Sequence, residues 1–92
     1  MSRETVTSLD EANEAVNDDK ALRVQPPAPN ATRYYWIEDG AWRHAKAGWG
    51  RAQATNAEDV RPKIKRQIER QDGRDRDDLL TAVPRENVEA EI

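Results

Sequence analysis

The stretch Arg33-Tyr34-Tyr35-Trp36-Ile37-Glu38-Asp39-Gly40-Ala41-Trp42 decides the fold. Its first half is rich in aromatic side chains, which favour strands, and Asp39-Gly40 is a preferred pair for a two-residue type I′ turn. The stretch therefore predicts a hairpin over residues 32–47. Counting outward from the turn gives the cross-strand pairs Glu38 with Ala41, Ile37 with Trp42, Trp36 with Arg43, Tyr35 with His44 and Tyr34 with Ala45.

This register places aromatic side chains on both faces of the hairpin. One face carries Ile37, Trp42, Tyr35 and His44, and the other carries Trp36, Arg43, Tyr34 and Ala45. We expect the available helices to cover only one face of so small a sheet. Some aromatic surface should then stay exposed or meet a partner.

Two helices are predicted from capping-box spacings, in which a Ser or Thr precedes a Glu by three residues. Ser8 and Glu11 open a short N-terminal helix, and Thr55 and Glu58 open the main helix over residues 56–72. The main helix has an apolar stripe that should pack on the sheet, formed by Ala57, Val60, Ile64 and Ile68. Pro62 predicts either a kink or a short opening turn followed by a restart, and Gly73 is the expected left-handed cap.

The remaining segments complete an α+β fold. Residues 20–25 alternate as a half-buried strand would, and the prolines of residues 26–30 predict an extended connection. We expect a small antiparallel sheet of about three strands, the kinked helix on one face, a short N-terminal helix and a C-terminal helical tail. Residues 1–73 should form the domain, and residues 74–92 an acidic linker and an amphipathic docking tail.

Composition limits the functional classes. The 92 residues are 36% charged and 36% hydrophobic, with no Phe and no Cys. So small and polar a chain is too short for a large enzyme, and it lacks thiolates for a metal site or a nucleophile. The net charge of −3 is uneven, because residues 33–74 hold ten basic and six acidic groups whereas both ends are acidic. The basic centre either is neutralised by the ends or is a surface for a polyanion.

Motifs of chemistry are weak. His44 is the only histidine and has no carboxylate at helical ligand spacing, so we expect no metal site and a histidine stacked beside Tyr35. Gly48-Trp49-Gly50 lacks the third glycine of a phosphate-binding loop, and we expect a bend that folds Trp49 into the core. No Ser-His-acid arrangement is recognisable. We predict no enzyme activity, no cofactor and no small-molecule substrate.

A protein-interaction or assembly subunit, such as an adaptor or a structural component of a larger complex, including a viral particle, is the first hypothesis. A core this thin commonly needs a partner or a homo-oligomer, and Trp, Tyr and Arg concentrate binding energy at interfaces. An alternative role for the aromatic residues is simply to fill the core. The candidate partner-binding residues are Tyr34, Trp36, Arg43, Trp49, Arg51, Leu79, Leu80, Val83, Val88 and Ile92.

A small nucleic-acid-binding regulator is the alternative hypothesis. Aromatic rings interleaved with Arg33, Arg43, Lys46 and Arg51 could stack single-stranded bases. The cations of the main helix are further candidates for phosphate contacts, namely Arg61, Lys63, Lys65, Arg66, Arg70 and Arg74. No apolar run reaches membrane-spanning length and no apolar signal region is visible, so we expect a cytoplasmic protein without membrane contact.

Overall fold

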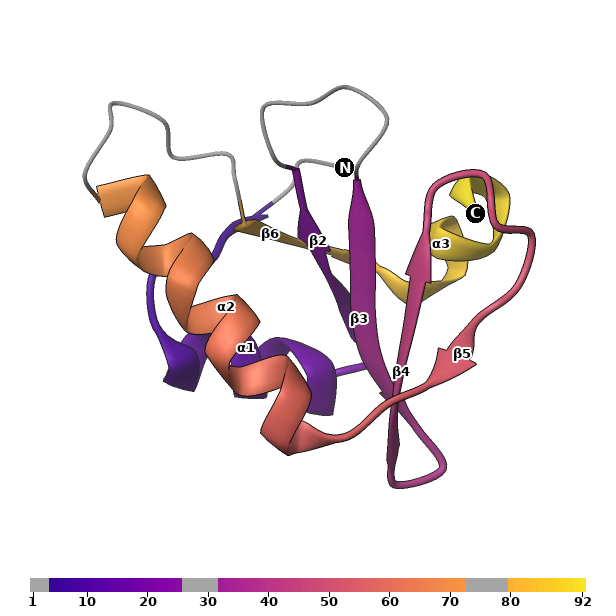
Figure 1. Cartoon of the computed structure of the whole chain (residues 1–92), viewed down its shortest axis with the longest axis horizontal. Helices are drawn as coiled ribbons and strands as arrows, with labels where there is room; N and C mark the ends of the chain where they lie inside the picture. Colours follow the sequence, from indigo (N-terminus) through magenta and orange to yellow (C-terminus); the bar gives the residue numbers. More distant parts are fainter. Residues whose placement is uncertain (1–3, 26–31, 73–79) are drawn as a thin grey trace.

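The computed structural model describes residues 4–25, 32–72 and 80–92. Within these ranges six strands form one antiparallel sheet in the order β1-β6-β2-β3-β4-β5 (Figure 1). The α+β class is confirmed, but the expected number of about three strands is too low. The elements in chain order are β1 (Glu4–Thr5), α1 (Leu9–Asn17), β2 (Lys20–Val24), β3 (Arg33–Glu38), β4 (Ala41–Lys46), β5 (Gln53–Ala54), α2 (Ala57–Asp72), β6 (Leu80–Pro84) and α3 (Arg85–Glu91).

The hairpin of β3 and β4 has the predicted register. All five predicted pairs, from Glu38 with Ala41 to Tyr34 with Ala45, are present. Asp39 and Gly40 have φ values of 54° and 77°, and a positive φ at both central positions is what a type I′ turn requires. The turn chemistry therefore sets which aromatic side chains face each side of the sheet.

Strand β6 is the main element that the sequence pattern does not reveal. It lies between β1 and β2, and the Val6 N–H donates to the Leu80 carbonyl at 2.9 Å where the chain leaves β1. The C-terminal segment therefore enters the sheet before it becomes helical at Arg85. The prediction of a helical C-terminal tail is therefore correct for α3 and wrong for Leu80–Pro84, which form a strand.

Helices cover both faces of the sheet, so the expectation of a single covered face is wrong. Figure 1 shows α2 and α3 on opposite sides of the strands. The core under α1 and α2 is built from Val6, Ala12, Ala15, Val16, Leu22, Val24, Tyr35, Val60, Ile64, Leu80 and Ala82. The smaller core under α3 is built from Ala21, Tyr34, Trp36, Ala45, Val83 and Val88.

Strand β2 is also covered on both faces, against the prediction. Its residues from Ala21 to Val24 are buried on both faces, whereas a half-buried strand was expected. Leu22 and Val24 join the larger core and Ala21 joins the smaller one. The alternation was right, but the side expected to face solvent lies against the α3 layer.

The helix starts agree with the predictions to within a residue. The Glu11 N–H donates to the Ser8 hydroxyl at 3.2 Å, although the Glu11 carboxylate accepts from Thr7 instead of reaching back to Ser8. In α2 the cap is Asn56, because its Oδ1 accepts from the Asp59 N–H at 2.9 Å. The cap is thus one residue later than the Thr55 expected.

The apolar stripe of α2 packs on the sheet as predicted. Val60 and Ile64 are buried in the larger core and Ile68 packs against it. Pro62 lies inside one continuous helix, so the restart, one of the two predicted alternatives, does not occur. The connection at residues 26–30, the Gly73 cap, the domain boundary at residues 73 and 74, the linker that follows it and Leu79 lie outside the described residues.

Candidate binding sites on the two sides of the sheet

The predicted partner-binding residues fall into two groups. Inside the molecule are Tyr34, Trp36, Leu80, Val83 and Val88, which form parts of the two cores. At the surface are Trp49 and Arg51, with Arg43 and Ile92 half-buried. Most of the apolar side chains selected from the sequence therefore have a role in folding.

A recess of about 360 Å³ lies between the sheet and α3. We call it the α3 recess, and its lining is Trp36, Glu38, Gly50, Arg51, Ala52, Arg85, Val88, Glu89 and Ile92. It brings together four of the predicted partner-binding residues, Trp36, Arg51, Val88 and Ile92, which are far apart in the sequence.

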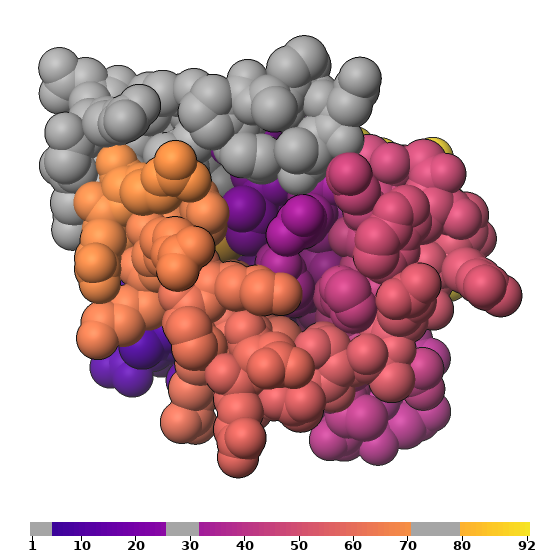
Figure 2. Space-filling model, in the orientation of Figure 1, coloured from indigo at the N-terminus to yellow at the C-terminus, as the bar shows by residue number. Residues whose placement is uncertain are grey.

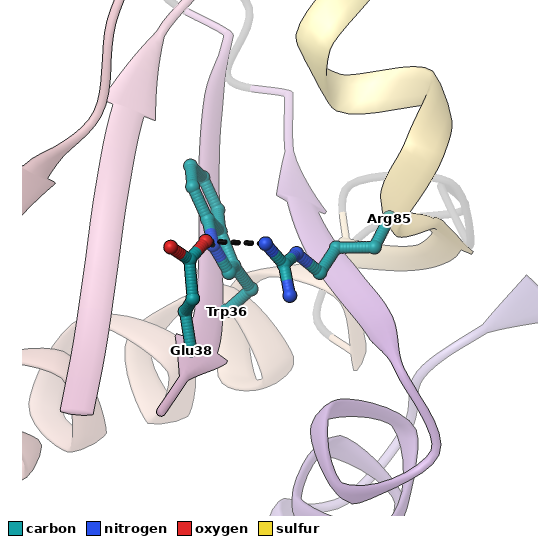
Figure 3. A network of polar contacts seen from close by, with 3 residues as sticks. All are labelled: Trp36, Glu38 and Arg85. Carbon is teal, nitrogen blue, oxygen red and sulfur yellow. Dashed lines mark hydrogen bonds and ion pairs between the residues drawn. The ribbon is translucent and has the colours of Figure 1, made fainter. Parts of the chain in front are cut away.

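Three residues of the α3 recess, Trp36, Glu38 and Arg85, form a network of polar contacts (Figure 3). The Arg85 guanidinium forms an ion pair with the Glu38 carboxylate and lies 6.0 Å from the centre of the Trp36 ring. The Trp36 indole N–H also donates to Glu38, at 3.4 Å. Arg85 thus links the first turn of α3 to β3 through both a carboxylate and an aromatic face.

A second polar contact joins the end of α3 to the sheet. The Tyr34 hydroxyl donates to Glu91 Oε2 at 2.8 Å. Burial raises the pKa of the Tyr34 hydroxyl above its usual 10.0, and the neighbouring Glu91 carboxylate raises it further. The Gly50 N–H donates to the Ile92 carbonyl at 2.6 Å, so α3 is held at both ends.

A groove of about 320 Å³ lies on the other side of the sheet, between α2 and the ends of β2 and β3 (Figure 2). We call it the basic groove, and its lining is Val24, Arg33, Tyr35, Lys63, Arg66, Gln67 and Arg70. Lys63, Arg66 and Arg70 recur at i, i+3 and i+7, so they share one stripe of α2 beside the apolar stripe. The packing of that apolar stripe on the sheet holds the three cations along the wall of the groove.

The lining of the basic groove contains four cationic residues and no acidic one. Within the described ranges, none of the side chains of Arg33, Lys63, Arg66 and Arg70 forms an ion pair. The effect reaches His44 on β4, where burial lowers the pKa of the imidazole below 6.5 and the charges of Lys63 and Arg33 lower it further. The lining of the groove therefore carries net positive charge.

A row of aromatic rings leads from the basic groove to the surface. Tyr35 lines the groove, and His44 stacks on it with 6.2 Å between ring centres and 11° between planes, as predicted. Trp49 meets His44 edge-on at 5.5 Å. The expectation that Trp49 folds into the core is wrong, because its side chain is 41% exposed and is the one exposed large hydrophobic in the described part of the chain.

Backbone geometry explains the outward position of Trp49. Gly48 and Gly50 on either side have φ values of 90° and 81°, a conformation that other residues rarely adopt. The chain therefore turns away from β4 before it returns as β5. His44 is the only ring that contacts Trp49 among the described residues.

The cations predicted to contact phosphates lie in different parts of the structure. Lys63, Arg66 and Arg70 line the basic groove, whereas Arg61 and Lys65 are exposed elsewhere on α2. Arg43 lies on the α3 side of the sheet, opposite Trp36, and Arg74 lies outside the described residues. The sequence did not reveal that Arg33 joins the α2 stripe, because its approach depends on how α2 crosses the sheet.

Among residues 4–25, 32–72 and 80–92, no group of three or more His, Asp or Glu side chains is placed to hold a metal ion. No helix in the same ranges is long and apolar enough to cross a membrane.

Comparison with known proteins gives no relative. No protein-family model matches the chain, and no curated protein or solved structure matches it.

Proposed function

We propose that the protein is a non-enzymatic nucleic-acid-binding module that contacts phosphates through the basic groove. The observation that carries the proposal is the set of four cations in a groove whose lining includes no acidic residue, without ion pairs to the described residues. Cationic side chains that are not paired with the protein's own carboxylates can contact the phosphates of a polyanion and release its bound counterions.

The residue types favour nucleic acid over an acidic protein as the polyanion. Three of the four cations are arginines, and a guanidinium can contact phosphate in a bidentate way and stack on planar groups. Tyr35 lines the groove, and His44 and Trp49 follow it as a row of rings in contact. Aromatic and cationic side chains in one groove are typical of sites that accept both phosphates and bases.

Fluorescence anisotropy with a labelled oligonucleotide tests the proposal, at low and at high salt. The test variant is Lys63→Gln combined with Arg66→Gln, which removes two cations from the groove. The control is Arg61→Gln combined with Lys65→Gln, which removes the same charge from exposed positions of α2 outside the groove. Circular dichroism checks that both variants are folded.

The expected result follows from counterion release. Each lost phosphate contact reduces the slope of log K against log salt by about 0.7 on a single strand, so the groove variant should lose about 1.4 of slope and roughly 25-fold in affinity at about 0.1 M salt. The control variant should stay close to the unchanged protein. The proposal is overturned when the unchanged protein does not bind at low salt, or when both variants lose affinity equally.

Protein assembly through the α3 recess is a second candidate function. It is favoured by the convergence of Trp36, Arg51, Val88 and Ile92 on one recess. Light scattering on the same samples distinguishes the two functions. A mass above that of one chain, returned to one chain by Arg51→Glu and unaffected by the groove variant, would support assembly; a single-chain mass at every concentration would count against self-assembly.

A further inference from the structure

We propose that the basic groove takes a single strand of nucleic acid and that Trp49 stacks on one of its bases. The inference rests on the proposed function and adds to it the class of nucleic acid and a second point of contact. It is carried by a cationic groove whose Tyr35 is connected through His44 to Trp49, the one exposed large hydrophobic ring in the described residues.

The shape of the groove favours a single strand. Its cations line a recess of about 320 Å³ between a helix and a sheet, and Val24 and Tyr35 contribute to the same lining. A duplex keeps its bases paired inside and presents a broad outer surface of phosphates. An extended single strand can place phosphates along Lys63, Arg66 and Arg70 while it turns a base toward the sheet.

Trp49 is the ring best placed to receive that base. Its side chain is 41% exposed, whereas Tyr35 is 3% exposed and Trp36 is 5% exposed. Its contact with His44 is T-shaped, and among the described residues no ring is stacked parallel on the indole. Through His44 and Tyr35 the indole belongs to the same face of the sheet as the groove.

Stacking of a base on Trp49 also explains why so large an apolar side chain is exposed. A large indole at the surface gives up much of the free energy that its burial would yield. The glycines on both sides of Trp49 adopt conformations that hold it outside the core. A base offers a flat apolar surface for such a ring, and in a single strand each base can present its face to the indole, whereas inside a duplex the neighbouring base pairs cover it.

Three labelled probes test the inference by anisotropy: a single-stranded oligonucleotide, the same strand annealed to its complement, and an abasic strand with the same phosphates but no bases. The variants are Trp49→Ala and Trp49→Phe, with the groove variant Lys63→Gln and Arg66→Gln for comparison. Thermal unfolding confirms that each variant is folded before it is titrated.

The single strand should bind more tightly than the duplex. Trp49→Ala should weaken the single strand about 5- to 150-fold, the range expected for one stacked base. Trp49→Phe should recover most of that loss because a ring is restored. On the abasic strand Trp49→Ala should have no effect, whereas the groove variant should weaken both strands.

The outcomes separate this inference from the proposed function. Equal binding of duplex and single strand, or an unchanged affinity in Trp49→Ala, overturns the inference. If the groove variant still loses affinity in that case, phosphate binding by the groove stands without base stacking. Absence of binding to all three probes at low salt overturns the proposed function, and the inference with it.

Discussion

The two sides of the sheet use charge differently. On the α3 side Arg85 pairs with Glu38 and lies over Trp36, and Tyr34 donates to Glu91. On the α2 side the cations Lys63, Arg66 and Arg70 form no ion pair with described residues. One side thus uses its charged groups to hold its own helix, and the other presents them to solvent.

Helix size explains the difference. α3 has seven residues and buries Val88 as its apolar anchor, so its position depends on contacts made by polar and aromatic side chains. α2 has sixteen residues and inserts Val60 and Ile64 into the larger core. A short helix has little stability of its own. A long helix that is anchored by an apolar stripe does not need its charged side chains to hold it on the sheet, so they can contact a ligand.

The largest expected effect comes from removing the aromatic support of α3. Trp36→Ala should lower the free energy of unfolding by about 3–5 kcal/mol, because it opens a cavity in the smaller core and removes the surface under Arg85. Trp49→Ala is the matched control and should cost about 1 kcal/mol or less, since its ring is partly exposed and contacts one neighbouring ring.

Urea unfolding followed by circular dichroism measures both variants, with the midpoint interpreted at constant m. Similar losses in the two variants would contradict the difference between a tryptophan that supports the fold and one that is placed for contact. A loss in Trp49→Ala alone would reverse the roles assigned to them.

A smaller effect should separate the charges of the two sides. Arg85→Gln should lower the free energy of unfolding by about 0.5–1 kcal/mol, because both members of its ion pair are partly exposed and screened. The double variant Lys63→Gln and Arg66→Gln should change the free energy of unfolding by less than about 0.5 kcal/mol. Both side chains are exposed and form no ion pair with the described residues.

Salt sharpens this second comparison. The loss in Arg85→Gln should shrink at high salt because the ion pair of the unchanged protein is weakened there. A groove variant that loses more stability than Arg85→Gln would show that the cations of α2 are structural, and the proposed function would lose its main support.

Local signals made part of this fold predictable. Asp39-Gly40 fixes a turn and hence the register of every pair in the hairpin, and the spacing of Val60, Ile64 and Ile68 marks the buried side of α2. Each depends on residues that are close in the sequence. Such features are determined by backbone geometry and by helical period alone.

Strand β6 was not predictable for a physical reason. Leu80, Thr81, Ala82 and Val83 are all buried because the strand lies inside the sheet with layers on both faces. A strand that is buried on both faces shows no alternation, and a short apolar run does not distinguish a strand from a helix. Its neighbours β1 and β2 are also far away along the chain.

The candidate site was predictable only in its components. The basic stripe of α2 and the aromatic segment were both visible, but the alternation of the hairpin sends Trp36 to the α3 side and Tyr35 to the groove. Arg33 joins the α2 cations only through the crossing of helix and sheet. Which aromatic ring stays exposed depends on this tertiary arrangement.

The smallest effect that we predict is opposite pH sensitivity on the two sides. The pKa of His44 is lowered below 6.5 in the folded protein, so protonation favours the unfolded chain, and stability should fall as the pH drops below 6.5. The pKa of Tyr34 is raised above 10.0, so ionisation favours the unfolded chain, and stability should fall as the pH rises above 10.0.

Unfolding midpoints measured across pH check this prediction with one variant for each side. His44→Gln should flatten the change between about pH 7 and about pH 5.5, above the range in which most carboxylates titrate, and Tyr34→Phe should flatten the change above pH 10.0. A bound phosphate beside Lys63 and Arg33 would offset the charges that depress the pKa of His44. Saturating oligonucleotide should therefore raise the His44 pKa seen by NMR, whereas an unmoved pKa would place the bound phosphates away from Lys63 and Arg33.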